Sequence, residues 1–215
     1  MRAILFDFDG TLADTAPDLG RAVNRMRVER GMPALPIETV RPYASSGARG
    51  LLKIAFGITG EDPQFARLRD EFLAHYDSAL CVQTRLFAGV AELLAEIERR
   101  GMAWGIVTNK ATRFTHRIVA ALGLAERVGC VVCGDTTPHI KPHPAPLLHA
   151  AQALALPPEV CCYLGDDLRD VQAAHAAGMS SVAVEWGYHG TENGGPRSWN
   201  AGAVIAQPKD LFRVL

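Results

Sequence analysis

The sequence predicts an α/β protein in which a parallel sheet carries helices on both faces and is interrupted once by an all-helical insert. Short apolar runs alternate with segments whose apolar residues recur at helical spacing, a pattern typical of parallel sheets covered on both sides. One long interval, from about residue 16 to residue 82, shows helical stripes and no convincing strand. Such an insert is most simply a second, smaller domain. We therefore expect a core of residues 1–15 and 84–215 and a helical domain of residues 16–83.

The core elements are expected in alternating order along the chain. Strands are predicted at residues 3–6, 103–107, 128–133, 160–164, 181–184 and 203–206. Helices are predicted from the segment 90–97, from Phe114, Ile118, Val119 and Leu122, from Leu147, Leu148, Ala151 and Leu154, and over residues 168–177. Gly101 and Gly123 stand where the first two of these helices should end. A surface loop is predicted at residues 191–196.

The insert contains three apolar stripes at helical spacing. They are Leu19, Ala22, Val23 and Met26, then Leu51, Leu52, Ala55 and Phe56, and then Phe65, Leu68, Phe72 and Tyr76. Each stripe is long enough for one amphipathic helix, so the insert is expected to be a small helical unit.

Composition excludes several classes of protein. The 215 residues are 48% hydrophobic and carry a formal net charge of -1, which gives no electrostatic case for nucleic acid or an anionic membrane as partner. The first apolar run ends at Asp7 and is too short for a signal sequence or a membrane span. We therefore expect a cytoplasmic protein, either a monomer or a homodimer. Of the five cysteines, Cys130 and Cys133 should point to opposite faces of one strand, and buried free thiols are expected.

Polar residues follow four of the predicted strands. The first strand ends at Asp7, the second at Thr108-Asn109-Lys110, the third at Gly134-Asp135-Thr136 with Lys141 a few residues on, and the fourth at Gly165-Asp166-Asp167 with Asp170 further on. In an open parallel sheet, ligands bind outside the carboxyl ends of the strands. The four clusters should therefore meet in one crevice.

The first cluster combines two carboxylates with a glycine and a hydroxyl. Asp7 and Asp9 repel each other, and each raises the pKa of the other unless a cation lies between them. A divalent metal would relieve this repulsion, and a carboxylate beside a metal suits attack on an anionic ester. Asp7 is expected to attack phosphorus and form an aspartyl-phosphate. Asp9 is expected to protonate the leaving alkoxide and then to deprotonate the hydrolytic water.

The other groups complete a site for phosphoryl transfer. Backbone N–H groups around Phe8 and Gly10, the Thr108 hydroxyl and the Asn109 amide should hold the phosphoryl oxygens. Lys141 should neutralise charge on the phosphoryl group and on Asp7. Mg²⁺ is the expected cofactor, bound by Asp7, the backbone carbonyl of Asp9, and Asp166.

The motifs together resemble those of the haloacid dehalogenase superfamily, and within it the phosphoglycolate phosphatase-like group. They are Asp7-Phe8-Asp9-Gly10-Thr11-Leu12, Val107-Thr108-Asn109-Lys110, Lys141-Pro142-His143-Pro144 and Gly165-Asp166-Asp167-Leu168-Arg169-Asp170. The resemblance implies a three-layer α/β/α, Rossmann-like core with an inserted helical cap. It also implies that Asp7 is the nucleophile, Asp9 the acid/base, Thr108 and Lys141 phosphate ligands, and Asp166 a metal ligand. Asp170 matches a position that usually supports the metal through water or from behind its ligands. Asp167 departs from the Ser or Thr of many relatives, so either Asp167 or Asp170 could be the residue that supports the metal more directly.

Several residues have a competing structural interpretation. Asp167 and Asp170 suit the cap and first turn of the helix at 168–177, an interpretation that we favour for Asp167 but not for Asp170. Thr108 and Asn109 could cap the helix that follows them. Arg49, in the segment Ser45-Ser46-Gly47-Ala48-Arg49-Gly50, could bind an anionic substrate or simply face solvent. Arg85 and Arg113 are weaker candidates for anion contacts.

The function that fits best is hydrolysis of a small phosphorylated metabolite. The favoured substrate is 2-phosphoglycolate. A phosphorylated amino sugar is the alternative, because the segments 104–110, 165–170 and 186–188 also resemble N-acetylmuramic acid 6-phosphate phosphatases. A phosphomutase would keep Asp9 as well, whereas a dehalogenase needs neither this acid nor a metal. Response-regulator-type phospho-acceptors are much shorter and lack a helical insert.

Overall fold

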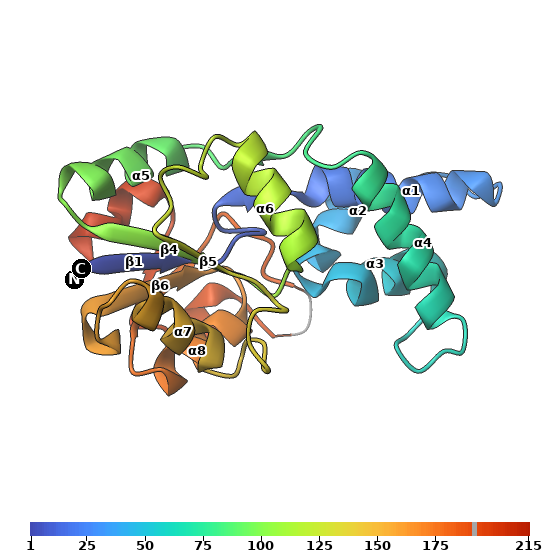
Figure 1. Cartoon of the computed structure of the whole chain (residues 1–215). Helices are drawn as coiled ribbons and strands as arrows, with labels where there is room; N and C mark the ends of the chain where they lie inside the picture. The colour runs from blue at the N-terminus through green and yellow to red at the C-terminus, as the bar shows by residue number, and fades with distance from the viewer. Residues whose placement is uncertain (191–192) are drawn as a thin grey trace.

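Six parallel strands form one sheet in the computed structural model, which describes residues 1–190 and 193–215 (Figure 1). The strand order is β5-β4-β1-β6-β7-β8. The strands are β1 (Ala3–Phe6), β4 (Ala103–Val107), β5 (Cys130–Val132), β6 (Cys161–Gly165), β7 (Ser180–Val184) and β8 (Ala203–Ile205). All six predicted strands are confirmed, with small shifts at their ends. The loop expected at 191–196 begins with Thr191 and Glu192, which lie outside the described residues.

Strand β1 lies in the middle of the sheet and is buried on both faces. Ile4 is in register with Trp104 of β4 on one side and with Cys162 of β6 on the other. Its alternate side chains enter two different hydrophobic clusters, Ile4 and Phe6 in one and Ala3 and Leu5 in the other. A strand that packs on both faces explains why the run is continuously apolar.

Four core helices cover the two faces of the sheet. They are α5 (Val90–Arg99), α6 (Thr112–Ala121), α7 (Ala145–Ala153) and α8 (Leu168–Ala176). Figure 1 shows α5 and α6 on one side of the sheet and α7 and α8 on the other, which confirms the α/β Rossmann-like fold. The stripe predicted for α7 is wrong at one position. Leu148 is 41% exposed, whereas Leu147, Ala150 and Ala151 face the core.

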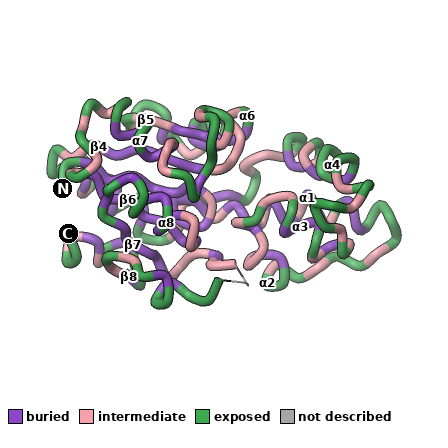
Figure 2. Tube along the Cα trace, turned by 90° about the horizontal axis from the view of Figure 1, so that it is seen from below, coloured by how far each residue is buried: buried purple, intermediate pink, exposed green. Residues whose placement is uncertain are grey.

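The interval after β1 contains only helices up to Ser78, apart from the short strand β2 (Ala13–Asp14). These helices are α1 (Ala16–Glu29), α2 (Ile37–Val40), the 3₁₀ helix η1 (Arg41–Ser46), α3 (Gly47–Phe56) and α4 (Phe65–Ser78). They lie beyond the end of the sheet in Figure 1, and Figure 2 shows their outer faces exposed. The apolar stripes predicted from the sequence are largely buried, with Phe56 and Phe65 only half-buried.

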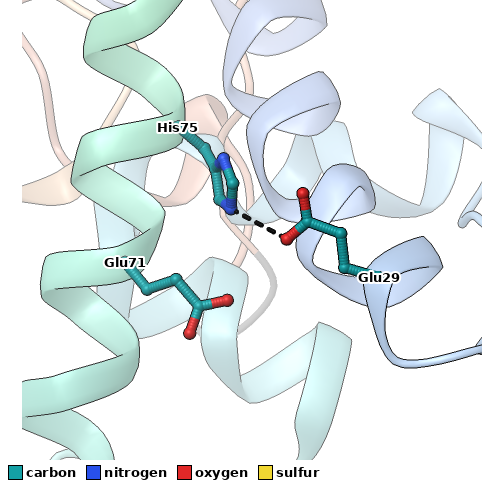
Figure 3. A group of neighbouring side chains, drawn as sticks. All are labelled: Glu29, Glu71 and His75. Atoms are coloured by element: carbon teal, nitrogen blue, oxygen red, sulfur yellow. Dashed lines mark ion pairs between the residues drawn. The ribbon is translucent and has the colours of Figure 1, made fainter.

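An ion-pair cluster joins α1 to α4 at the surface (Figure 3). His75 Nε2 lies 3.2 Å from Glu29 Oε2, and Glu71 accepts two hydrogen bonds of 2.7 Å from the Arg30 guanidinium. Glu29, Glu71 and His75 are close enough together to hold a metal ion. Because Arg30 already neutralises Glu71 and Glu29 is exposed, the cluster is better explained as a link between two helices.

The chain enters and leaves this helical segment through two paired linkers. Ala13–Asp14 (β2) pairs antiparallel with Arg85–Leu86 (β3). Next to this pair, the buried Asp18 carboxylate accepts hydrogen bonds from Thr84 N (2.9 Å) and Thr84 Oγ1 (2.7 Å). The two-residue strands were too short to predict from apolar patterning. Among the described residues, no helix is long and apolar enough to cross a membrane.

Candidate active site

A cleft of about 510 Å³ opens at the carboxyl ends of β1, β4 and β6. It is lined by Asp7, Asp9, Leu19, Ala44, Ser45, Ser46, Gly47, Arg49, Thr108, Asn109, Lys110, Ile140, Lys141, Asp167, Arg169 and Asp170. Groups from each of the four polar clusters therefore meet in one crevice, as the parallel sheet predicts, but Asp135 and Thr136 of the third cluster are exposed and do not line it. Arg85 and Arg113 are exposed and do not line this cleft, so the cleft gives no support to their role as anion contacts.

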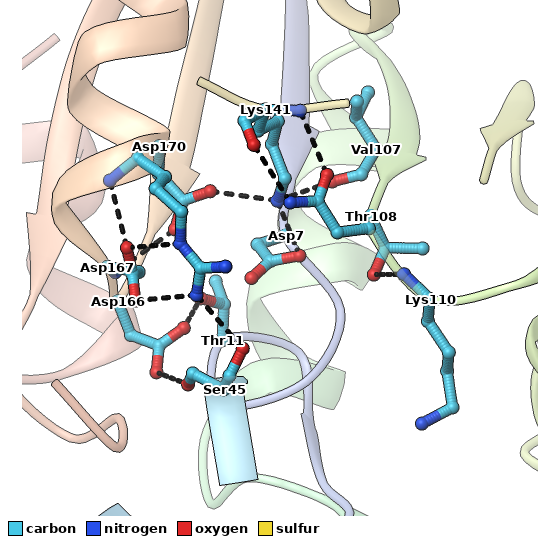
Figure 4. Close-up of polar contacts among 12 residues, drawn as sticks. Asp7, Thr11, Ser45, Val107, Thr108, Lys110, Lys141, Asp166, Asp167 and Asp170 are labelled. Atoms are coloured by element: carbon cyan, nitrogen blue, oxygen red, sulfur yellow. Dashed lines mark hydrogen bonds and ion pairs between the residues drawn. The ribbon is translucent and has the colours of Figure 1, made fainter. Parts of the chain in front are cut away.

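Asp7 lies against a buried lysine (Figure 4). Lys141 Nζ is 2.8 Å from Asp7 Oδ1 and 2.8 Å from Asp170 Oδ1, and its side chain is 3% exposed. Burial raises the pKa of Asp7 to about 7, although the charge of Lys141 opposes this shift. Burial alone would lower the pKa of Lys141, but Asp170 and Asp7 outweigh it and hold that pKa above its usual value. The ammonium group therefore stays charged beside the carboxylate.

Three carboxylates converge beside this lysine in a manner that suits a divalent cation. Asp7, Asp166 and Asp170 each offer one oxygen, and these oxygens lie within 4.8 Å of one another. Burial, and then repulsion by Asp7 and Asp170, raises the pKa of Asp166 well above its ordinary value. Three negative charges against the one positive charge of Lys141 leave an excess of two, which a divalent cation would balance. Carboxylate oxygens are ligands that Mg²⁺ prefers, so these residues fit that ion.

The position of Asp166 depends on two glycines. Gly10 has φ +89°, and a Cβ placed on it would lie 2.1 Å from Asp166 Oδ2. A Cβ placed on Gly187 would lie 2.1 Å from the Cβ of Asp166. The carboxylate is held by hydrogen bonds from Thr11 Oγ1 (3.0 Å) and Tyr188 N (2.8 Å). Only residues without a side chain allow the backbone to approach this close.

The Gly10 N–H has a partner that the sequence did not reveal. It donates to Ala13 O at 3.0 Å, so it is not the free phosphate donor that we expected. The Phe8 side chain is fully buried in the core, and its carbonyl accepts from Leu12 N and Ala13 N. The structure thus uses Gly10 for close approach to Asp166, while the Phe8 N–H remains a predicted phosphate donor.

Asp167 and Asp170 have different roles at the start of α8. Asp167 is the N-cap residue, accepts from Arg169 N at 2.9 Å, and forms an ion pair with the Arg169 guanidinium at 2.8 Å. Asp170 Oδ2 accepts from Asp167 N at 3.0 Å, while its Oδ1 faces Lys141. The capping interpretation favoured for Asp167 is confirmed, and Asp170 is the carboxylate that joins the acidic group.

Asp9 lies apart from the three carboxylates. Its Oδ1 accepts from the Thr15 hydroxyl and lies 2.9 Å from Lys110 Nζ. The Lys110 ammonium also lies 4.8 Å from the centre of the Tyr76 ring on α4. Asp9 is therefore held between the first linker and a cationic side chain at the rim of the cleft, and its backbone carbonyl remains a predicted metal ligand.

Thr108 and Asn109 do not cap the helix that follows them. The N-cap residue of α6 is Ala111, so that alternative is wrong. Thr108 is buried at the base of the cleft, and its hydroxyl accepts from Lys110 N at 3.2 Å. The Asn109 side chain donates to Lys141 O at 3.0 Å and accepts from Lys141 N at 2.9 Å. The Asn109 amide therefore holds the backbone of Lys141 in place, whereas we had expected it to bind the phosphoryl oxygens.

Three residues in this region were given no role from the sequence. They are Lys110, Arg169 and Tyr163, whose hydroxyl lies 2.7 Å from Lys141 Nζ. Arg169 also donates to Ser45 O at 2.9 Å, which links α8 to the helical insert. Lys110 and Arg169 stood inside the quoted motifs, but Tyr163 looks like any buried strand residue, and no pattern in one sequence marks it.

Most charged side chains in the cleft are already paired. Lys141 faces Asp7 and Asp170, Lys110 faces Asp9, and Arg169 faces Asp167. Arg49 is exposed and lines the cleft, and its guanidinium makes no hydrogen bond or ion pair with any residue that the structure describes. It is the positive charge left available for a ligand.

Comparison with known proteins supports the resemblance seen in the motifs. The family model for haloacid dehalogenase-like hydrolases matches residues 4–184. The chain is 43% identical over 216 residues to an N-acetylmuramic acid 6-phosphate phosphatase of Pseudomonas putida, covering 100% of this chain and 96% of that protein. It is 44% identical over 211 residues to a phosphoglycolate phosphatase of Xanthomonas campestris, covering 98% and 95%.

The solved structures agree with the sequence relatives. A predicted phosphoglycolate phosphatase from Haemophilus somnus superposes with a TM-score of 0.86 at 27% identity, covering 100% of this chain and 97% of that one. The family match extends from β1 to β7 and includes every strand end that contributes to the cleft. The chain therefore belongs to the haloacid dehalogenase-like hydrolase family.

Proposed function

We propose that this protein is a Mg²⁺-dependent phosphomonoesterase that forms an aspartyl-phosphate on Asp7. The observation that carries the proposal is the position of Asp7 in the lining of the cleft, with Lys141 at 2.8 Å and two further carboxylates close by. Asp7, Asp166 and Asp170 would hold the ion, which would supply positive charge beside the phosphoryl oxygens. Phosphatase names among the relatives support the same activity.

The reaction divides between two carboxylates. A carboxylate oxygen of Asp7 attacks phosphorus, the ester P–O bond breaks, and Asp9 gives its proton to the leaving oxygen. Asp9 then takes a proton from water, the water oxygen attacks phosphorus, and the bond to Asp7 breaks to release phosphate. Lys141 and the Thr108 hydroxyl stabilise the negative charge on the transferring group.

Residues 16–83 would act as a cap over this reaction. The η1 helix reaches the core through Ser45, whose Oγ lies 3.3 Å from Asp166 Oδ2 and whose carbonyl accepts from Arg169. The paired linkers β2 and β3 give the segment one entry and one exit. A lid of this kind would admit substrate and then exclude bulk water from the aspartyl-phosphate.

The substrate should carry a second negative group on its alcohol part. Among the described residues that line the cleft, Arg49 is the cation without a charged partner, and its guanidinium suits a carboxylate in two-point contact. 2-Phosphoglycolate has its carboxylate one carbon from the ester and is the first candidate.

A second candidate is a larger carboxylated ester, N-acetylmuramic acid 6-phosphate. A further cleft of about 620 Å³ shares Ser46, Arg49, Asp167 and Arg169 with the first and continues to Tyr43 and Gly60. Both clefts are present while Ser45 O of the helical segment accepts a hydrogen bond from Arg169 of the core. They therefore do not result from a cap that has moved away from the core. Space beyond Arg49 favours an alcohol part of sugar size.

The test is phosphate release from phenyl phosphate, 2-phosphoglycolate and N-acetylmuramic acid 6-phosphate, with and without Mg²⁺. We expect all turnover to need Mg²⁺ and to disappear in Asp7→Asn. Arg49→Ala should lower kcat/KM for the two carboxylated esters and spare phenyl phosphate, whereas Arg67→Ala, an exposed arginine of α4, should change neither. Interconversion of sugar phosphates without phosphate release would indicate a phosphomutase. Full activity of Asp7→Asn would refute the proposed nucleophile.

A further inference from the structure

Tyr163 places a polar group in the interior of the sheet. It lies in β6, is 1% exposed, and packs in the same cluster as Leu5 and Leu147. A hydroxyl buried at such a depth is costly unless it is hydrogen-bonded. The Tyr163 hydroxyl accepts from Lys141 Nζ at 2.7 Å and donates to Val107 O at 2.7 Å (Figure 4 shows the surrounding residues).

These contacts bear on which oxygens accept hydrogen bonds from the Lys141 ammonium. An ammonium group has three protons, and Lys141 Nζ lies near four oxygens. Asp7, Asp170 and Tyr163 are 2.8, 2.8 and 2.7 Å away, and Val107 O is 3.1 Å away. The hydrogen bonds of Lys141 Nζ run to Tyr163, Asp170 and Val107, whereas Asp7 Oδ1 is in ion-pair contact with the ammonium and accepts no hydrogen bond from the described residues.

Tyr163 is the neutral side chain among the partners of Lys141. Asp7 and Asp170 each cancel part of the lysine charge. A tyrosine hydroxyl accepts one hydrogen bond from the ammonium and leaves its positive charge available. The Tyr163 hydroxyl keeps its own proton, which it donates to Val107 O at 2.7 Å. A carbonyl alone at 3.1 Å would hold the ammonium more loosely.

We propose that Tyr163 is a positioning residue that holds the Lys141 ammonium within ion-pair distance of Asp7, beside the phosphoryl group that Asp7 would carry. It does not touch substrate, because it lies beneath Lys141 and does not line the cleft. The inference rests on the proposed function of Lys141. No feature of a single sequence assigns this role to Tyr163.

The test begins with Tyr163→Phe, which removes the hydroxyl and keeps the ring. The kcat for phenyl phosphate should fall about tenfold, the effect of one lost hydrogen bond, while KM stays within about twofold. Cys161→Ala changes a buried neighbour on the same face of β6 and should leave kcat unchanged. A wild-type kcat in Tyr163→Phe would overturn the proposal.

A double-mutant cycle separates positioning from a general loss of structure. If Tyr163 acts through Lys141, adding Tyr163→Phe to Lys141→Ala should cause no further loss, whereas independent effects would multiply. Should Lys141→Ala turn over too slowly, the same cycle is measured on the binding of inorganic phosphate with Mg²⁺ by calorimetry. Multiplying effects in either cycle would refute positioning. Failure of the wild type to hydrolyse any ester would instead refute the proposed function.

Discussion

Replacement of Asp166 by asparagine should stabilise the metal-free protein and abolish its response to Mg²⁺. Asp166 is fully buried, and its carboxylate lies within 4.8 Å of those of Asp7 and Asp170. Two unit charges at that separation repel by about 3 kcal/mol at an effective dielectric constant of about 20. Asparagine offers one acceptor oxygen where Asp166 uses two, for Thr11 and Tyr188, and this loss costs about 1 kcal/mol. The expected net gain is about 2 kcal/mol in the free energy of unfolding at about pH 8.

The gain should depend on pH in a defined direction. The pKa of Asp7 is about 7 in the folded protein, above its ordinary value of 3.8, and that of Asp166 is also raised. Because the folded state holds these protons more tightly than the unfolded chain, the metal-free protein loses stability as the pH rises through this interval. For Asp7 alone the loss is at most about 4 kcal/mol and is complete above about pH 7. Because the pKa of Asp166 is raised, the gain from Asp166→Asn should be smaller at about pH 5 than at about pH 8.

The assay is urea unfolding near these two pH values, with chelator or with Mg²⁺. Mg²⁺ at about 100 times its dissociation constant should stabilise the wild type by about 2.7 kcal/mol, and more at the higher pH. Glu126→Gln, an exposed acid far from the cleft, is the control for loss of one negative charge. The reasoning fails if Asp166→Asn is less stable than wild type without metal at the higher pH, or if Mg²⁺ stabilises both proteins equally.

Three further changes test separate parts of the site. Gly10→Ala should cost at least about 2 kcal/mol in urea unfolding and weaken Mg²⁺ binding, since φ is +89° and the new methyl would lie 2.1 Å from Asp166 Oδ2; wild-type values would show that the loop adapts. Asp9→Asn should slow both leaving-group departure and hydrolysis of the intermediate in rapid-quench kinetics, and unchanged turnover would exclude its proton-transfer role. Gly60→Trp should lower kcat/KM for the sugar acid ester about tenfold and leave phenyl phosphate unaffected, whereas Gly60→Ala, whose Cβ makes only ordinary contact with Arg49, should match wild type; equal rates in both variants would exclude the second cleft as a subsite.

The sequence could predict the sheet because its signals are local. An uninterrupted apolar run such as Ala3–Phe6 needs burial on both faces, and only a central strand of a covered sheet supplies it. The position of Asp7 at the end of that run, with Asp166 at the end of another, then followed from the parallel direction of the strands. The antiparallel pairing of β2 with β3 could not be predicted, because a strand of two residues is too short to show an alternating apolar pattern.

The side-chain contacts of the site depend on register and could not be predicted in the same way. Tyr163 meets Lys141 because β6 lies beside β1 with Leu5 opposite Tyr163, and Lys141 arrives from a loop that Asn109 holds in place. Each of these relations joins residues far apart in the chain, so no spacing within one segment encodes them. The Gly10 N–H shows a different limit, because its acceptor, Ala13 O, lies in a local turn that the residue types did not predict. Residue types and strand ends therefore predict which groups lie together in the site. Which hydrogen bonds these groups make can be read only from the packed structure. Tyr163 is the residue for which this difference affects the proposed function.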